Sequence, residues 1–150
     1  DGKAPIVGDG GNMRSMSYVD NLVQGIELCA THPAAPGRTF WIADARPYSM
    51  NEIVDTVEAM LEEAGIPCAH SRLRLPALAG PVAYGIDAAL QKVGLYHQKI
   101  HVLGEMDKNI ACSIDGARTA LGYDPKVDLA EGMRRSIRWA IEVGHLKVPR

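Results

Sequence analysis

The segment GGNMRSMSYVDNL, residues 10–22, is the most informative stretch of this sequence. It places a single arginine, Arg14, between a glycine-rich turn and the start of an expected helix. The guanidinium carries five donors in a planar fork that suits a phosphate or a carboxylate. Arg14 is therefore our first candidate for contact with an anionic ligand. The alternative is an exposed arginine on a turn, because most arginines lie at protein surfaces.

The glycines before Arg14 do not match a dinucleotide-binding loop. That fingerprint needs G-x-G-x-x-G at the start of a helix, so that helix N–H groups face the pyrophosphate. Counted from Gly8, Met13 stands in the place of the third glycine, and the residues after it favour a strand. We expect a hairpin turn that joins short strands at residues 6–7 and 13–17.

About five helices are predicted. Ser49 and Glu52 form a capping box ahead of an apolar run, and Asp128 and Glu131 have the same spacing before the last helix. A short helix over residues 115–121 precedes a glycine. Helices are also expected over residues 19–30 and from residue 76 or 81 to about residue 93, with apolar stripes at helical spacing facing the core. These stripes are Val19, Leu22, Val23, Ile26, Cys29 and Ala30, and Val82, Ile86, Ala89, Leu90 and Val93.

Short strands are expected over residues 39–43, 68–75 and 110–113, and residues 95–109 are predicted to be mostly loop with a strand or two. These strands are too short and scattered to close a sheet, and stable proteins normally cover or pair such edges. The fold class is therefore α/β and helix-rich. We expect residues 1–150 to form one unit that is a lobe of a longer enzyme.

Composition excludes several classes of protein. A net charge of -2, one Phe and two Trp argue against nucleic acid as a partner. The three cysteines form no C-x-x-C pair, which indicates reduced thiols in the cytoplasm rather than a zinc ribbon or a redox motif. No apolar run reaches ~18 residues, so we expect no membrane partner.

His97 and His101 have H-x-x-x-H spacing, which on a helix would place two imidazoles on one face for zinc. A metal-dependent hydrolase is thus one hypothesis, although no Glu follows the first His and no third ligand is evident. A loop of a substrate pocket and a solvated loop are the other interpretations. No Tyr lies four residues before a Lys, and no G-x-S-x-G elbow occurs, so we expect no catalytic residues in this chain.

Residues 14–22, RSMSYVDNL, resemble the extended short-chain dehydrogenase/reductase family, which comprises NAD-dependent nucleotide-sugar epimerases and dehydratases with 3β-hydroxysteroid dehydrogenase-like relatives. Their C-terminal half carries an arginine, three residues, His or Tyr, Val, and an acidic or amide pair that opens a helix. Further segments resemble the family in the same order, namely GRTFWIAD at 37–44, YSMNEI at 48–53, and residues 117–125 and 129–139.

The resemblance implies a helix-rich C-terminal lobe of an extended Rossmann-type enzyme, which binds the substrate. An N-terminal Rossmann lobe of the same protein would be its partner and would hold NAD(P) and the catalytic residues. We therefore expect no cofactor and no metal in this chain, no activity of the chain alone, and a cytoplasmic parent enzyme. A homodimer is a further expectation. The alternative is a stand-alone helical interaction module without enzymatic activity.

The resemblance also assigns five substrate-binding residues. Arg14 matches the family's contact with the diphosphate of a nucleotide sugar, and Ser17 and Tyr18 border the same pocket. Gln98 and His101 lie in the segment that reaches over the nucleotide. The second arginine that epimerases often carry near residues 103–104 is missing. This departure leaves room for another substrate with a hydroxyl or carbonyl group.

Overall fold

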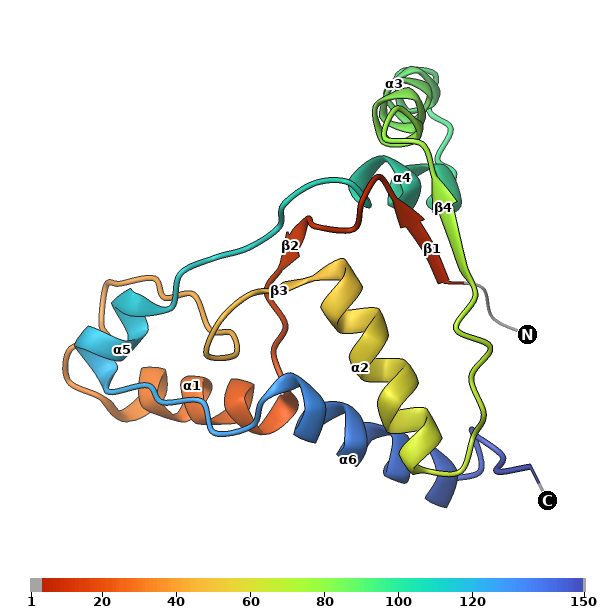
Figure 1. Ribbon diagram of the computed structural model, residues 1–150. Coiled ribbons are helices and arrows are strands. Elements are labelled where there is room, and N and C mark those ends of the chain that lie inside the picture. The colour runs from red at the N-terminus through yellow and green to blue at the C-terminus, as the bar shows by residue number, and fades with distance from the viewer. Residues whose placement is uncertain (1–3, 150) are drawn as a thin grey trace.

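Six helices and four short strands make up the computed structural model, which describes residues 4–149 (Figure 1). The helix-rich α/β class is confirmed, and the sixth helix is α4, in a segment predicted to be loop. The helices are α1 (Val19–Thr31), α2 (Met50–Glu63), α3 (Ala79–Lys92), α4 (Gln98–Glu105), α5 (Asp115–Leu121) and α6 (Leu129–Glu142). The strands are β1 (Ala4–Val7), β2 (Met13–Arg14), β3 (Tyr48–Ser49) and β4 (Arg72–Leu75).

The strands form two separate two-stranded sheets. Strand β1 pairs in parallel with β4, and β2 pairs antiparallel with β3, so that Arg14 lies opposite Tyr48. The predicted hairpin between the first two strands is therefore wrong. Gly8 and Gly10 have positive φ angles of 69° and 74°. The turn they form carries the chain from one sheet to the other, and each strand finds its partner far away in the sequence.

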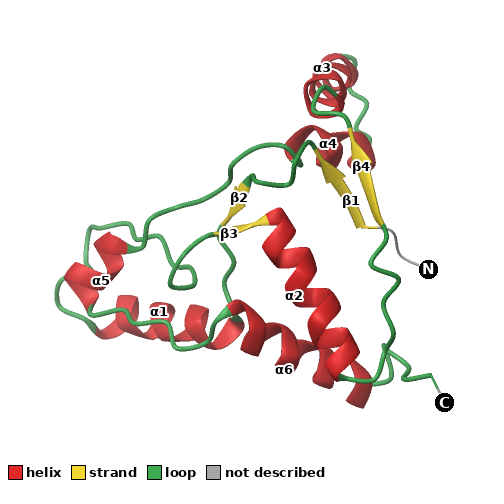
Figure 2. Ribbon diagram, viewed as in Figure 1, coloured by secondary structure: helices red, strands yellow, loops and turns green. Residues whose placement is uncertain are grey.

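The helix caps are confirmed. The Ser49 hydroxyl accepts a hydrogen bond from the Glu52 backbone N–H at 3.1 Å, and the Asp128 carboxylate accepts one from the Glu131 N–H at 2.9 Å. Gly122 ends α5 in the left-handed conformation, with a φ of 68°. Helices α2 and α6 pack against each other below the two sheets (Figure 2).

Helix α1 occurs where predicted, but it buries the opposite face. Its buried residues are Asn21 and Gly25, whereas most of the predicted stripe is exposed. A Cβ at Gly25 would lie 2.6 Å from the Ile42 side chain, so the missing side chain lets Ile42 pack on the helix backbone. The exposed apolar residues of α1 are Val19, Leu22, Val23 and Ile26.

The Asn21 carboxamide joins three distant segments. Its nitrogen donates to the Asp44 carboxylate at 2.8 Å and to the Val127 carbonyl at 2.7 Å. Its oxygen accepts from the backbone N–H groups of Lys126 and Val127, each at 3.1 Å. The same Asp44 oxygen accepts from the Tyr18 N–H at the start of α1. The nitrogen and the oxygen of this buried amide therefore both have hydrogen-bond partners, as is usual for buried polar groups.

A small apolar core lies beside this amide, built from Ala43, Ile114, Ala117 and Tyr123. The Tyr123 hydroxyl donates to the Ala43 carbonyl at 2.7 Å, and burial raises the pKa of Tyr123 to about 12. The predicted strands over residues 39–43 and 110–113 do not form within the described chain. Within the described residues, the only β pairing of these two segments is an isolated bridge between Ile110 and Arg14.

Helices α3 and α4 form a hairpin that corrects two predictions. Residues 95–109, expected to be mostly loop, contain α4. The predicted buried stripe of α3 is largely exposed, and the helix instead buries Gly80, Ala83 and Asp87. A Cβ at Gly104 of α4 would lie 3.0 Å from the Tyr84 backbone. Small residues therefore set the contact between the two helices.

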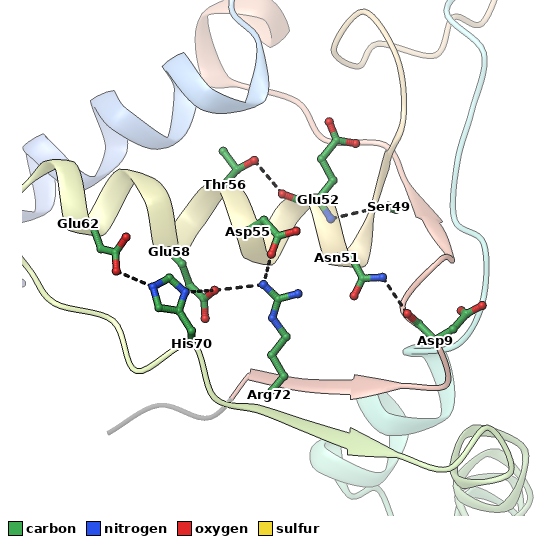
Figure 3. A network of polar contacts seen from close by, with 10 residues as sticks. All are labelled: Asp9, Ser49, Asn51, Glu52, Asp55, Thr56, Glu58, Glu62, His70 and Arg72. Carbon is green, nitrogen blue, oxygen red and sulfur yellow. Dashed lines mark hydrogen bonds and ion pairs between the residues drawn. The ribbon is translucent and has the colours of Figure 1, made fainter.

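A network of charged side chains ties the start of β4 and the segment before it to helix α2 (Figure 3). His70 has a φ of 46°, and its two ring nitrogens lie 3.1 Å from the Glu58 carboxylate and 2.6 Å from the Glu62 carboxylate. Arg72 pairs with Asp55 and with Glu58. The hydrogen bonds to Glu62 and then Glu58 raise the pKa of His70 above 6.5. Both ring nitrogens can donate only in the imidazolium form.

We predict that His70 makes the stability of the chain depend on pH. Because its folded-state pKa is raised, its contribution is fully present below about pH 6.5 and is lost as the pH rises through the folded-state pKa. His70→Gln should therefore reduce the drop in urea midpoint between acidic and basic pH, measured by circular dichroism. His97→Gln, at an exposed position, is the control. An unchanged drop in the His70 variant would contradict the prediction.

We also predict that Asn21→Leu lowers the free energy of unfolding by about 3 kcal/mol, because it removes a buried network and orphans its partners. Gln24→Leu, on the same helix, should change it by less than about 0.5 kcal/mol. Urea denaturation of both variants measures the difference. Equal effects would show that the Asn21 network contributes little.

Candidate functional site

Arg14 is held between β3 and the end of α4. It lies in β2 opposite Tyr48 and bridges Ile110 on its other side. One terminal nitrogen of its guanidinium donates to the Glu105 carbonyl at 2.6 Å. Glu105 is the last residue of α4, where helix carbonyls carry partial negative charge. Arg14 is half-buried, and the hydrogen bond to Glu105 anchors its guanidinium.

The segment after α4 is bound to the strand that carries Arg14. The Asn12 side chain donates to the Met106 carbonyl at 2.9 Å and to the Lys108 carbonyl at 3.3 Å. The Met13 N–H donates to the Asn109 side chain at 2.6 Å. These contacts join residues more than ninety positions apart. They hold the end of α4 against β2 and thereby orient Arg14.

Lys108 adds a second cation near this end of α4. Its ammonium lies 2.7 Å from the Glu105 carboxylate and 4.0 Å from the centre of the Tyr84 ring. The hydrogen bond from Lys108 lowers the pKa of the Glu105 carboxyl and raises the pKa of the Lys108 ammonium. The electrostatic environment of Arg14 thus includes an anchored carboxylate and a second cation.

Ser17 and Tyr18 line a cavity of about 130 Å³ at the start of α6. The Tyr18 ring packs on Gly132, where a Cβ would lie 2.9 Å from Cδ2 of the ring. Arg135 covers the ring, with its guanidinium carbon 5.8 Å from the ring centre. Ser17 is exposed and also borders a larger cleft of about 700 Å³ that includes Trp41.

Gln98 and His101 lie on α4. Gln98 is its exposed first residue, and His101 faces α3. The His101 Nδ1 lies 2.8 Å from the Asp87 carboxylate, which also accepts from Gln91 at 2.7 Å. The Tyr96 ring stacks at a tilt on the His101 ring, with 5.6 Å between ring centres. The described residues contain no group of three or more His, Cys, Asp or Glu suited to a metal ion.

The structure places the five predicted substrate-binding residues in two separate regions of the fold. Arg14 is linked to α4, and so to the helix that carries Gln98 and His101, through the Glu105 carbonyl. Ser17 and Tyr18 instead face the start of α6. Asp87, the buried partner of His101, was missed by sequence reasoning. It is the only acidic residue between Arg74 and Gly104, which could have indicated a buried pair.

No protein-family model matches the chain. A protein designated "Uncharacterized protein y4nL" from Sinorhizobium fredii is 52% identical over 145 residues, covering 96% of this chain and 41% of that protein. A 3beta-hydroxysteroid-dehydrogenase/decarboxylase of Arabidopsis thaliana is 30% identical over 149 residues, covering 88% of this chain and 32% of the enzyme. The chain therefore spans about two fifths or less of these relatives.

Among solved structures, UDP-glucuronic acid 4-epimerase from Bacillus cereus, in complex with UDP-glucuronic acid and NAD, has the same fold. Its TM-score is 0.59 at 20% identity, over 94% of this chain and 36% of the epimerase. The fold is thus that of the helix-rich C-terminal lobe of a Rossmann-type enzyme. The sequence relatives narrow this class, because the chain is homologous to the C-terminal portion of extended short-chain dehydrogenases/reductases.

None of the helices in residues 4–149 is long and apolar enough to cross a membrane.

We predict that Gly132→Ala destabilises the chain by about 1–3 kcal/mol, because the added methyl group would overlap the Tyr18 ring. Gly85→Ala in α3 is the matched control, since an added Cβ there would meet no atom within 4 Å. This control should stabilise the chain by about 0.5–1 kcal/mol, the usual gain for Gly to Ala in a helix. Thermal unfolding distinguishes the two; destabilisation by both variants would refute the packing argument.

Proposed function

We propose that this chain is the substrate-binding portion of an NAD(P)-dependent nucleotide-sugar epimerase/dehydratase or a related hydroxyl or carbonyl oxidoreductase. The observation that supports this most is the position of Arg14. Its guanidinium is anchored by the Glu105 carbonyl at the end of α4, on a strand bound to the following segment. A fixed, half-buried arginine is suited to bind a diphosphate or carboxylate, because its fork is already ordered.

The residues of this chain do not fit NAD(P). A dinucleotide needs a glycine loop whose open backbone meets the pyrophosphate at a helix start. Here a Cβ at Gly10 would lie 2.4 Å from the Asn51 side chain, so the space beside the turn is filled. The turn also leads into β2 and not into a helix. In the parent enzyme, NAD(P) would bind to a Rossmann lobe, and the chain alone would lack catalytic competence.

The same Rossmann lobe is the partner that we propose for the exposed side of α1. Four large apolar residues of α1 are exposed, together with Trp41, which is 68% exposed. Trp41 belongs to residues 39–43, which have strand-forming composition but pair with no strand in the described chain. Next to them lies the cleft of about 700 Å³. Residues 39–43 pack through Ile42 on Gly25, on the buried side of α1, and a neighbouring sheet would supply the strand that they lack.

We predict that isothermal calorimetry will detect binding of UDP-glucuronic acid or dTDP-glucose to the chain, and no tight binding of NAD. Arg14→Met should abolish the binding. Arg14→Lys should weaken it by roughly tenfold, because an ammonium keeps the charge but loses the fork. Arg46→Met is the matched control, since Arg46 is exposed and pairs with Glu52.

Three outcomes would count against the proposal. Tight NAD binding would place the cofactor in this chain. Unchanged binding in Arg14→Met would remove Arg14 from the site. If no nucleotide sugar binds and Arg14→Met leaves the parent enzyme's KM unchanged, the stand-alone helical interaction module becomes the better explanation.

A further inference from the structure

The turn that follows α4 is weakly held by its own backbone. After Glu105, the last residue of the helix, the Met106 N–H donates to the Leu103 carbonyl at 3.3 Å. The Lys108 N–H donates to the Glu105 carbonyl, also at 3.3 Å. Both distances lie beyond the usual range for an N–H···O hydrogen bond. Because the last carbonyl groups of a helix have no partner within the helix, this turn depends on donors from other segments.

Two side chains from the segment that contains β2 supply those donors. The Asn12 amide donates to the Met106 carbonyl at 2.9 Å and to the Lys108 carbonyl at 3.3 Å. The Arg14 guanidinium donates to the Glu105 carbonyl at 2.6 Å. Asn12 and Arg14 therefore hold neighbouring carbonyl groups of the same turn, and the position of one contact affects the other.

The backbone of Asn12 is fixed independently of α4. Its carbonyl accepts a hydrogen bond at 3.0 Å from the N–H of Met50, the first residue of α2. Directly after Asn12, strand β2 pairs with β3. The Asn12 side chain therefore connects the turn after α4 to a part of the fold whose position is already set by α2 and β3.

Arg14 uses only a small part of its guanidinium for the contact with this turn. Its partner is a neutral carbonyl, and the nearby Glu105 carboxylate is paired instead with the Lys108 ammonium at 2.7 Å. Within residues 4–149, the Arg14 side chain makes no other hydrogen bond. One N–H of one terminal nitrogen is used, so one of the two paired edges of the fork stays complete. Such an edge binds two oxygens of a single phosphate or carboxylate group.

We propose that Asn12 is the positioning residue for Arg14 in the proposed substrate site. By holding the turn after α4, Asn12 keeps the Glu105 carbonyl where it orders the guanidinium, with one edge left for the anionic group of a sugar nucleotide. An arginine that is already ordered loses less conformational entropy on binding, which improves affinity. This inference rests on the proposed function, because it needs Arg14 to bind the anion.

Isothermal calorimetry tests the proposal, with dTDP-glucose as the ligand or with UDP-glucuronic acid if only the latter binds. Asn12→Ala should weaken binding by roughly three- to tenfold, because the Arg14 side chain must then be ordered by the ligand. Asn51→Ala is the matched control, since the Asn51 amide donates to the Asp9 carbonyl of the glycine turn at 2.8 Å and not to α4. This control should change affinity by less than about twofold. Thermal unfolding of both variants shows whether their losses of stability are comparable.

A double-mutant cycle separates positioning from a general structural effect. In an Arg14→Lys chain, Asn12→Ala should weaken binding by less than about twofold, because an ammonium has no fork to orient. The same loss in both backgrounds would overturn the proposal. Unchanged binding in Asn12→Ala, or an equal loss in Asn51→Ala, would overturn it as well. If the unmodified chain binds neither sugar nucleotide, the proposed function fails and this inference fails with it.

Discussion

The fold depends on one buried amide. Asn21 lies on α1, yet its hydrogen bonds reach the Asp44 carboxylate and the backbone just before α6. Each donor and acceptor of the carboxamide has a partner, so hydrogen bonds compensate the cost of removing this group from water. The α1 helix is consequently positioned by polar contacts on the side that faces the rest of the chain. Its apolar side is left open for the contacts that we propose with a Rossmann lobe.

Local signals in the sequence predicted the helix ends well. Capping residues such as Ser49 and Asp128 act on N–H groups within the first helical turn, so their effect does not depend on the rest of the fold. Burial was predicted poorly because it depends on the rest of the fold, which local signals do not report. Periodicity shows that α1 and α3 each have an apolar face, but it does not show what covers that face. In both helices the buried residues are a glycine and one polar residue, with an alanine in addition in α3.

The candidate site was predictable in part. A single arginine after a glycine turn marked Arg14, and the structure gives it a fixed position. The carbonyl that fixes it comes from Glu105, 91 residues later, in a segment whose helix was not predicted. Helix α4 was missed because its eight residues are few and include Gly104, which lowers helix propensity but permits the close contact with α3. Strand predictions failed wherever a partner strand was required and was absent from the described residues.

The long-range pairing of the N-terminal segment has a consequence for how the chain folds. Strand β1 needs residues 72–75, β2 needs residue 110, and Asn21 needs residues 126 and 127. Strand β2 can pair with residues 48–49, and the start of α1 can bond Asp44, once those residues are available. The other contacts wait for residues 72–127, which makes the topology non-local and slow to assemble. During synthesis, α1 would emerge with its apolar side exposed and its amide unpaired. In the longer enzyme that we propose, a Rossmann lobe that has already folded would be the first surface that α1 meets, since domains generally fold in order from the N-terminus.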